Sequence, residues 1–150
     1  AARSVIVVDA SFWVAAFLAQ DAHHNQSARL LRRMVTDDMQ VSSPTLALVE
    51  VAGALARRTG SQALAESAIR YLQRQSWLTL SPLSVAFSEA AARVAITCSL
   101  RGADAIYVTL ARQEGAPLIA LDDEMLKRSA AAILAMTPGE WLRQNPGDRP

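Results

Sequence analysis

Two kinds of hydrophobic pattern alternate along the chain. Short continuous runs of apolar, often β-branched residues are separated by longer stretches in which apolar residues recur at helical spacing. Continuous runs of this kind are typical of strands that are buried on both faces of a parallel sheet. Five such runs predict five strands, at Val5 to Val8, Met39 to Ser42, Trp77 to Leu80, Pro117 to Leu121 and, more weakly, Ala132 to Met136.

The stretches between these runs predict helices. Helical spacing is clearest in three groups, which are Ala28, Leu31 and Met34, then Leu64, Ala68 and Leu72, and then Phe87, Ala91, Val94 and Cys98. Pro44 is predicted to open an apolar helix that runs through Glu50. The segment from Arg57 to Gly60 ends this helix with cations and a glycine, and Gly102 separates two further helices.

This alternation of strand and helix predicts an α/β fold. We expect a three-layer α/β/α sandwich around a central, mostly parallel five-stranded sheet, doubly wound in the Rossmann manner. The length of 150 residues, without an interdomain linker, predicts a single domain over residues 1–150. The polar, proline-containing stretch from Asn145 to Pro150 is expected to be a disordered tail.

Composition narrows the class of protein. Hydrophobic residues make up 51% of the chain and charged residues 19%, which is typical of a globular domain. The apolar stretch Pro44 to Ala56 is interrupted by Glu50 and is too short to span a bilayer, so no membrane span is expected. Cys98 is the only cysteine, which excludes an intrachain disulfide and favours a cytoplasmic protein. A net charge of +1 means that any binding of nucleic acid must depend on local groups.

Four carboxylates stand at positions where a parallel sheet places its ligand site. Such sheets bind ligands beyond the carboxyl ends of their strands. Asp9 follows the first predicted strand, and Asp122 follows the fourth. Asp104 directly precedes an apolar helix, and Glu50 is the only charge between Pro44 and Ala56. An ionised Glu on an apolar helix is costly to bury without a partner, so Glu50 must face a cleft, an arginine or a cation.

Each carboxylate also has a purely structural interpretation. Asp9 could close a turn with Ser11 capping the next helix, and Asp104 could be a helix N-cap. Asp122 and Asp123 could both be turn residues. Glu50 could pair with Arg57 or Arg58. These alternatives remain open for each residue taken singly.

Taken in order, the carboxylates form a pattern that resembles a known family. The segments that carry the resemblance are Val7-Val8-Asp9-Ala10-Ser11, Leu48-Val49-Glu50-Val51, Arg101-Gly102-Ala103-Asp104-Ala105-Ile106-Tyr107 and Leu118-Ile119-Ala120-Leu121-Asp122. They resemble the four acidic motifs of PIN-domain nucleases, and most of all the VapC-like toxins of bacterial toxin–antitoxin modules. Ala10 and Ala120 depart from the family pattern, which often has threonine at these positions.

The resemblance implies a site, a reaction and partners. Asp9, Glu50, Asp104 and Asp122 would bind metal and carry catalysis, Ser11 would support the site, and Asp123 competes with Asp122 for the fourth position. The implied reaction is endonucleolytic hydrolysis of RNA that leaves a 5′-phosphate and a 3′-hydroxyl. The implied assembly is a homodimer inhibited by a cognate antitoxin protein.

The chemistry of the residues agrees with a hard metal ion. Carboxylates that converge repel one another unless a cation neutralises them, and all-oxygen ligands favour Mg²⁺ or Mn²⁺. His23 and His24 are adjacent in an early loop and are expected at the surface, so zinc is not predicted. Arg101 and Lys127 are candidate contacts for substrate phosphates. Trp13 is expected in the core or at a dimer interface, in preference to stacking on a base.

Three rival functions fit the sequence less well. A haloacid-dehalogenase-type phosphatase needs a second acid two residues after the first, where this chain has Ser11. A phospho-accepting receiver domain needs an early acidic pair and a lysine after its last strand, but the only lysine is Lys127. The third rival is a PIN-like module that binds RNA or a partner without cutting. A cleavage assay with and without Mg²⁺ separates it from a nuclease.

Overall fold

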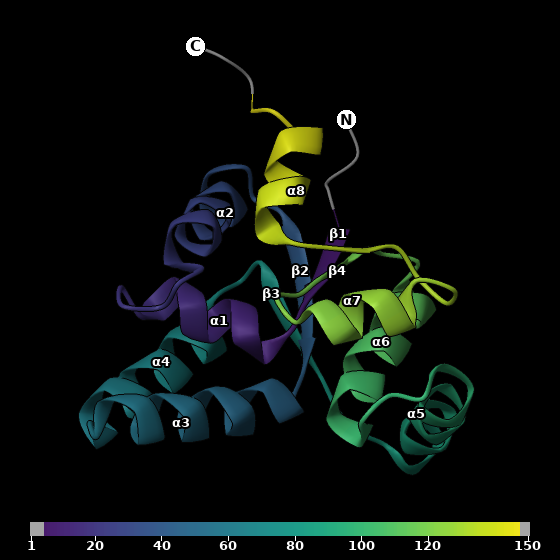
Figure 1. The fold of residues 1–150 in the computed structure, drawn as a ribbon. Helices are drawn as coiled ribbons and strands as arrows, with labels where there is room; N and C mark the ends of the chain where they lie inside the picture. Colours follow the sequence, from purple (N-terminus) through teal and green to yellow (C-terminus); the bar gives the residue numbers. More distant parts are fainter. Residues whose placement is uncertain (1–4, 148–150) are drawn as a thin grey trace.

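A parallel sheet of five strands runs through the middle of the molecule (Figure 1). The computed structural model describes residues 5–147. The strands are β1 (Val5–Val8), β2 (Gln40–Pro44), β3 (Leu78–Ser81), β4 (Leu118–Ile119) and β5 (Ala135–Met136). Their order in the sheet is β3-β2-β1-β4-β5, and every pair is parallel. The predicted fold class and the existence of all five predicted strands are therefore confirmed, although β5 begins at Ala135 and not at Ala132.

The central strand β1 pairs with β2 on one side and with β4 on the other. In register, Val5 lies opposite Gln40, and Val7 lies opposite both Ser42 and Leu118. The order of the strands reverses between β1 and β4, which makes this the switch point where such sheets bind ligands. The strand β4 is shorter than predicted, although the Ala120 N–H still donates to the carbonyl of Met136 beyond its end.

Helices cover both faces of the sheet, as Figure 1 shows. One face carries α1 (Ala10–Phe17), α2 (His24–Thr36), α3 (Leu46–Thr59) and α4 (Gln62–Arg74). The other carries α5 (Val85–Cys98), α6 (Gly102–Glu114) and α7 (Asp123–Ser129). The last helix, α8 (Pro138–Gln144), packs against α2. Two faces of helices around a parallel sheet make the predicted three-layer sandwich.

Two predicted boundaries are corrected. Pro44 is the last residue of β2, and α3 begins two residues later at Leu46. The pyrrolidine ring forces the preceding residue into an extended conformation, so Pro44 prolongs the strand and does not open the helix. The predicted tail is wrong at its first residue, because Asn145 donates to Trp141 and accepts from Arg33. Residues 148–150 of that predicted tail lie outside the described residues.

The end of α3 agrees with the sequence prediction, but α6 begins at Gly102, so Asp104 lies inside this helix and does not precede it. Gly60 ends α3 in the left-handed region at φ 68°, where glycine carries no steric penalty. Gly102 is the first residue of α6 and lies after the end of α5. The position of Asp104 in the first turn of α6 depends on this boundary.

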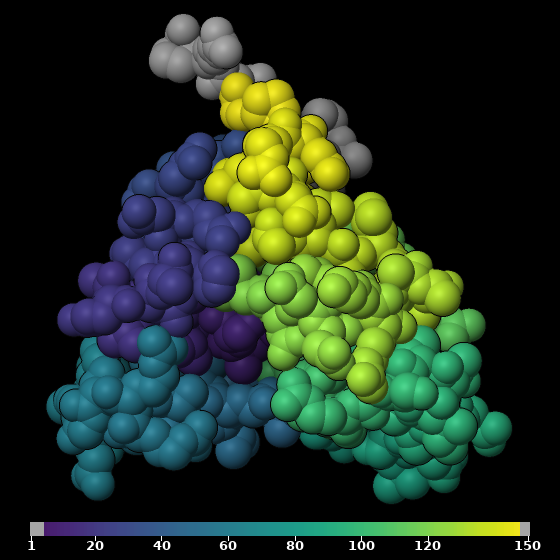
Figure 2. All heavy atoms as spheres, viewed as in Figure 1, coloured from purple at the N-terminus to yellow at the C-terminus, as the bar shows by residue number. Residues whose placement is uncertain are grey.

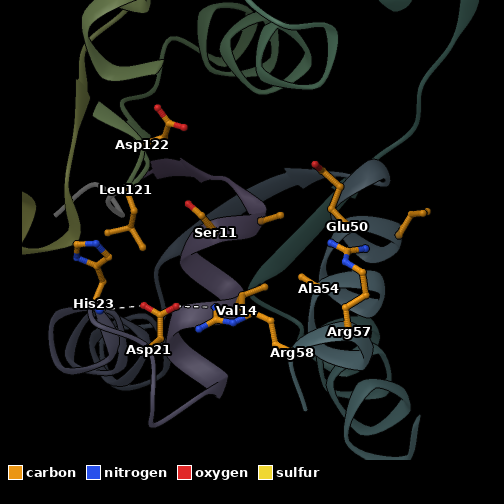
Figure 3. A pocket seen from close by; sticks show the side chains of 12 residues that line it. Ser11, Val14, Asp21, His23, Glu50, Ala54, Arg57, Arg58, Leu121 and Asp122 are labelled. Carbon is orange, nitrogen blue, oxygen red and sulfur yellow. Dashed lines mark hydrogen bonds and ion pairs between the residues drawn. The ribbon is translucent and has the colours of Figure 1, made fainter. Parts of the chain in front are cut away.

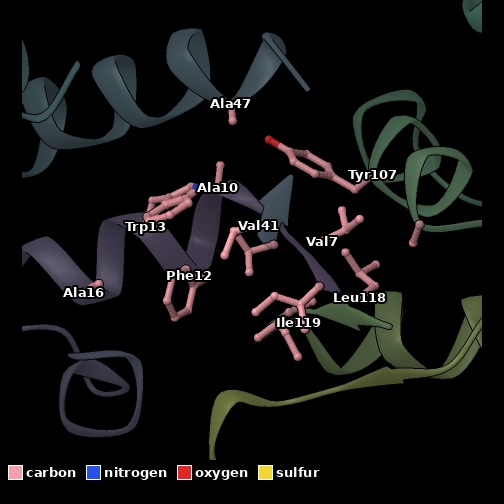
Figure 4. Close-up of a cluster of buried hydrophobic side chains, with 14 of the residues drawn as sticks. Val7, Ala10, Phe12, Trp13, Ala16, Val41, Ala47, Tyr107, Leu118 and Ile119 are labelled. Carbon is pink, nitrogen blue, oxygen red and sulfur yellow. The ribbon is translucent and has the colours of Figure 1, made fainter. Parts of the chain in front are cut away.

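The core lies where β1 and α1 meet (Figure 4), and two hydrogen bonds of Ser43 form a polar bridge through it. Phe12 and Trp13 are fully buried and pack edge to face, with ring centroids 5.1 Å apart. The Trp13 indole Nε1 donates to Ser43 Oγ at 3.1 Å, and Ser43 Oγ donates to the carbonyl of Val8 at 2.7 Å. Trp13 is therefore a core residue, as expected, and is not available to stack on a base.

Within residues 5–147, no single helix is long and apolar enough to cross a membrane. The helices α5 and α6 reach the necessary length and apolar character only when they are counted together, and they are bent by 107° relative to each other.

Replacing Ser43 by alanine should destabilise the fold by about 1–3 kcal/mol, because the buried Trp13 N–H then loses its acceptor. Ser27 offers a matched control. It is equally buried, and its Oγ has no hydrogen-bond partner in the described part of the chain. Ser27→Ala should be neutral or stabilising, since it removes an unpaired buried polar atom. Urea denaturation of both variants tests this, and equal losses of stability would contradict the polar bridge.

Candidate active site

Asp9 occupies the end of the central strand and is the most buried carboxylate of the site. It is the N-cap of α1, and one carboxylate oxygen accepts from the Phe12 N–H at 3.2 Å. The Ser11 hydroxyl lies 2.8 and 2.9 Å from the two carboxylate oxygens and donates to them. The cap is thus Asp9 and not Ser11, and Ser11 supports Asp9 through a direct hydrogen bond.

Burial controls the charge of Asp9. Only 7% of the residue is exposed, and this burial raises the pKa of its carboxyl to about 7. The hydrogen bonds from Ser11 and Phe12 lower the pKa, while the charges of Asp104 and Glu50 raise it further. Asp104 on α6 and Glu50 on α3 are therefore close enough to Asp9 to repel its ionised form.

Glu50 is oriented by a residue that the sequence analysis did not assign. The Tyr107 hydroxyl on α6 donates to Glu50 Oε1 at 2.5 Å. Burial, and then the hydrogen bond to Glu50, raise the pKa of the Tyr107 phenol, so it remains a donor. Figure 4 shows the Tyr107 hydroxyl pointing toward α3. The alternative pairing of Glu50 with Arg57 or Arg58 is wrong, because within residues 5–147 Glu50 forms no ion pair with either, and Arg58 pairs with Asp21 at 2.7 Å.

A single arginine bridges the other two carboxylates. Arg101 donates from Nε to Asp104 at 3.1 Å and from a terminal nitrogen to Asp122 at 3.3 Å. Asp104 lies in the first turn of α6 but is not its N-cap, since that position is Arg101. Asp122 caps α7 by accepting from two backbone N–H groups, those of Glu124 and Met125. A guanidinium thus supplies positive charge between two of the four predicted site residues.

A hollow of about 700 Å³ opens beside the carboxylates. Glu50 and Asp122 line it from opposite walls, with Ser11 between them (Figure 3). In the space-filling view, atoms of the α1 region are seen between α3 on one side and α6 and α7 on the other (Figure 2). Arg57 and the ion pair of Arg58 with Asp21 lie further along this hollow. Neither Asp21 nor Arg57 had been predicted as a site residue.

The other polar residues considered for the site in the sequence analysis lie at or near the surface. Asp123 is the exposed first residue of α7 and lines neither the 700 Å³ hollow nor the hollow shared by Asp104 and Asp122, whereas Asp122 lines both. Lys127 is exposed on α7. His23 is exposed and lines the hollow, but His24 is half-buried with its ring Nδ1 2.8 Å from the carbonyl of Ala15.

The donor set fits a hard divalent cation by its chemistry. All four candidate ligands are carboxylates, and the pKa of Asp9 is raised first by its burial and then by the nearby charges of Asp104 and Glu50. Within residues 5–147, however, no three such side chains stand close enough together to form a ready-made metal site. The carboxylates share one rim of the sheet, but their side chains have not converged on one point.

Comparison with known proteins identifies the family. The sequence of residues 6–131 matches the model of the PIN domain. The chain belongs to the PIN-domain family. This match covers most of the chain and includes all four predicted carboxylates. A comparison with curated protein sequences finds no match.

Solved structures share this PIN fold. VapC20 from Mycobacterium tuberculosis, described as a toxin that cleaves the sarcin-ricin loop, is 24% identical with a TM-score of 0.71, over 86% of this chain and 96% of that one. VapBC2 from Rickettsia felis, bound to promoter DNA, is 13% identical with a TM-score of 0.64, over 89% and 98%. A toxin–antitoxin complex from Klebsiella pneumoniae is 16% identical with a TM-score of 0.64, over 89% and 97%. At these identities the likeness establishes the fold alone.

The burial of Asp9 predicts how the stability of the metal-free protein depends on pH. The folded carboxyl has a pKa of about 7, above the ordinary value of 3.8, so the folded state holds a proton that the unfolded state has lost. Stability in EDTA should therefore fall as pH rises from about 4 to about 7. The loss due to Asp9 is on the order of 4 kcal/mol, at about 1.4 kcal/mol for each pKa unit.

Asp9→Asn should remove this dependence, because asparagine caps a helix about as well and does not titrate. The stability of the variant relative to the wild type should therefore increase from pH 4 to pH 8 in EDTA. Guanidinium denaturation at several pH values measures the difference, and other titrating groups cancel in it. Parallel curves of unfolding free energy against pH for the two proteins would show that ionisation of Asp9 does not destabilise the folded state.

Proposed function

We propose that this chain is a Mg²⁺- or Mn²⁺-dependent endoribonuclease and acts as the toxin of a toxin–antitoxin pair. The observation that carries the proposal is the buried carboxyl of Asp9 at the switch point of the sheet, where Asp104 and Glu50 raise its pKa. A buried carboxylate with two like charges beside it favours the binding of a cation. A fold that needed only a helix cap would not require the other two charges.

The residues proposed to hold the cation are Asp9, Glu50, Asp104 and Asp122. A bound divalent cation supplies Lewis-acid activation of water and of the phosphodiester. The chain itself orients two of these ligands before any cation arrives. Ser11 and the Phe12 N–H restrict the Asp9 carboxylate, and Tyr107 restricts Glu50. Such preorganisation lowers the cost of assembling the site.

Arg101 and Lys127 are the proposed contacts for substrate phosphates. The Arg101 side chain is 77% exposed, so it is accessible to a substrate even while it contacts Asp104 and Asp122. Guanidinium groups bind phosphates in a forked geometry that lysine cannot match, which favours Arg101 as the stronger contact. RNA as the substrate class is supported by the family and by the description of VapC20 as a toxin that cleaves the sarcin-ricin loop.

The proposed partners are a second copy of the chain and an antitoxin protein. The structural likeness to a toxin–antitoxin complex from Klebsiella pneumoniae supports the antitoxin. The 700 Å³ hollow beside Glu50 and Asp122 is the surface on which an antitoxin segment would block the carboxylates. A basic side chain from such a segment would be attracted by their charge.

Asp104→Asn should reduce metal-dependent RNA cleavage by on the order of 100-fold, the scale at which a single electrostatic stabiliser contributes to an active site. Its metal-free stability should change little, because its ion-pair partner Arg101 has an exposed side chain and solvent screens such a pair. The measurement is cleavage of an end-labelled RNA in Mg²⁺ or Mn²⁺, with EDTA as the metal-free control.

Asp123→Asn is the matched control, since it removes the same charge from an exposed neighbour of the site. It should cleave within a few-fold of the wild type. Full activity of Asp104→Asn would remove this residue from the site. Cleavage that persists undiminished in EDTA would refute the dependence on metal.

A further inference from the structure

Three adjoining hollows lead away from the candidate active site between α5, α6 and α7. The first, of about 330 Å³, is lined by the carboxylates Asp104, Asp122 and Glu124 and by Arg101, Arg128 and Ser99. Ser99 and Arg128 also line the next hollow, of about 440 Å³. That hollow in turn shares residues with a third, of about 390 Å³. Neighbouring hollows therefore adjoin one another along a line from Asp104 and Asp122 to the C-terminal end of α6.

The second and third hollows, which we call the α5–α6 groove, carry only positive charge. Arg93 from α5, Arg112 from α6 and Arg128 from α7 line them, and no carboxylate does. Within residues 5–147, Arg93 and Arg112 form no ion pair. Arg128 is held in place by the carbonyl of Ser99 at 2.6 Å and by Glu124 at 2.9 Å. Two exposed arginines thus face a common groove with no counter-charge.

This arrangement contrasts with the 700 Å³ hollow on the other side of the site. There, Arg58 is neutralised by Asp21, and Glu50 and Asp122 contribute negative charge. The protein as a whole has a net charge of only +1, so it exerts little general attraction on a polyanion. Local groups must supply that attraction, and in the α5–α6 groove Arg93 and Arg112 have no ion-pair partner within residues 5–147.

We propose that the α5–α6 groove binds the sugar–phosphate backbone of the RNA strand that enters the candidate active site. The proposal rests on the proposed nuclease function and adds the path of the substrate to it. Arg93 and Arg112 contact successive phosphates distant from the cut, and Thr97, which lines both hollows, offers a hydroxyl donor. Arginine is suited to phosphate because its guanidinium presents two parallel donors. A strand bound here would reach the carboxylates through the hollow lined by Arg101.

The test is a double variant, Arg93→Gln with Arg112→Gln, and a control in which Arg29→Gln is combined with Arg32→Gln. The control removes two exposed arginines from α2, on the opposite side of the sheet (Figure 1). The probes are fluorescent oligouridylates of 4 and 12 nucleotides, with polyglutamate of matched charge as a competitor. Binding is followed by anisotropy in EDTA over a range of salt concentrations. Cleavage of the 12-nucleotide probe in Mn²⁺ is measured on the same samples.

The groove variant should bind the 12-nucleotide probe about tenfold more weakly than the wild type, and the slope of log affinity against log salt should fall by about 1.4, for two lost phosphate contacts. Binding of the 4-nucleotide probe and the melting temperature should not change. Unchanged affinity for the longer probe, or a loss of affinity equal to that of the control, would overturn the proposal that this groove binds RNA. Polyglutamate that binds as tightly as RNA, with the same dependence on Arg93 and Arg112, would overturn RNA as its ligand.

The two arms of the experiment separate the groove from the nuclease proposal. Wild-type protein that binds RNA through Arg93 and Arg112 but does not cut it in Mn²⁺ would sustain the groove and refute the nuclease. If the wild type cuts RNA and the groove variant binds and cuts it equally well, the proposal that the groove binds RNA is refuted and the nuclease proposal is not.

Discussion

The structure depends on a carboxyl that is buried at the end of its central strand. Asp9 links three features, because it ends β1, caps α1 and faces the charges of Asp104 and Glu50. Burial alone would favour the neutral acid, while the hydrogen bonds from Ser11 and Phe12 favour the ionised form. These opposing effects bring the pKa of Asp9 close to neutrality. Ionisation of Asp9 therefore destabilises the metal-free fold, and a bound cation can relieve this cost. The apolar core around Trp13 provides the stability that offsets it.

Arginines lie both next to the carboxylates of this site and further away from them. Arg101 bridges Asp104 and Asp122, so part of the repulsion is already relieved by the chain itself. Arg128 is held by Ser99 next to the same hollow, and Arg93 and Arg112 extend the basic groove away from it. A polyanion guided by these arginines would be brought to carboxylates that otherwise repel it. The attraction of a substrate and the need for a cation therefore follow from one pattern of charge.

The sequence was sufficient for the parts that depend on local pattern and topology. Apolar runs located the five strands, and the rule that ligands bind at the carboxyl ends of parallel strands singled out Asp9 and Asp122. It was insufficient for contacts between distant residues, such as Tyr107 with Glu50 and Arg58 with Asp21, because packing between helices determines which side chains meet. The placement of Pro44 failed for a local reason, since a proline that can open a helix can equally end a strand.

The most direct test of the central claim is the melting temperature with and without Mn²⁺ at pH 8, where Asp9 would be largely ionised. A ligand that binds only the folded state raises this temperature by mass action. Without metal, Asp9→Asn should melt above the wild type, because one of the repelling charges is gone. In millimolar Mn²⁺ the wild type should gain several degrees, EDTA should reverse the gain, and the variant should gain little. Equal shifts in both proteins, or none in the wild type, would contradict the account.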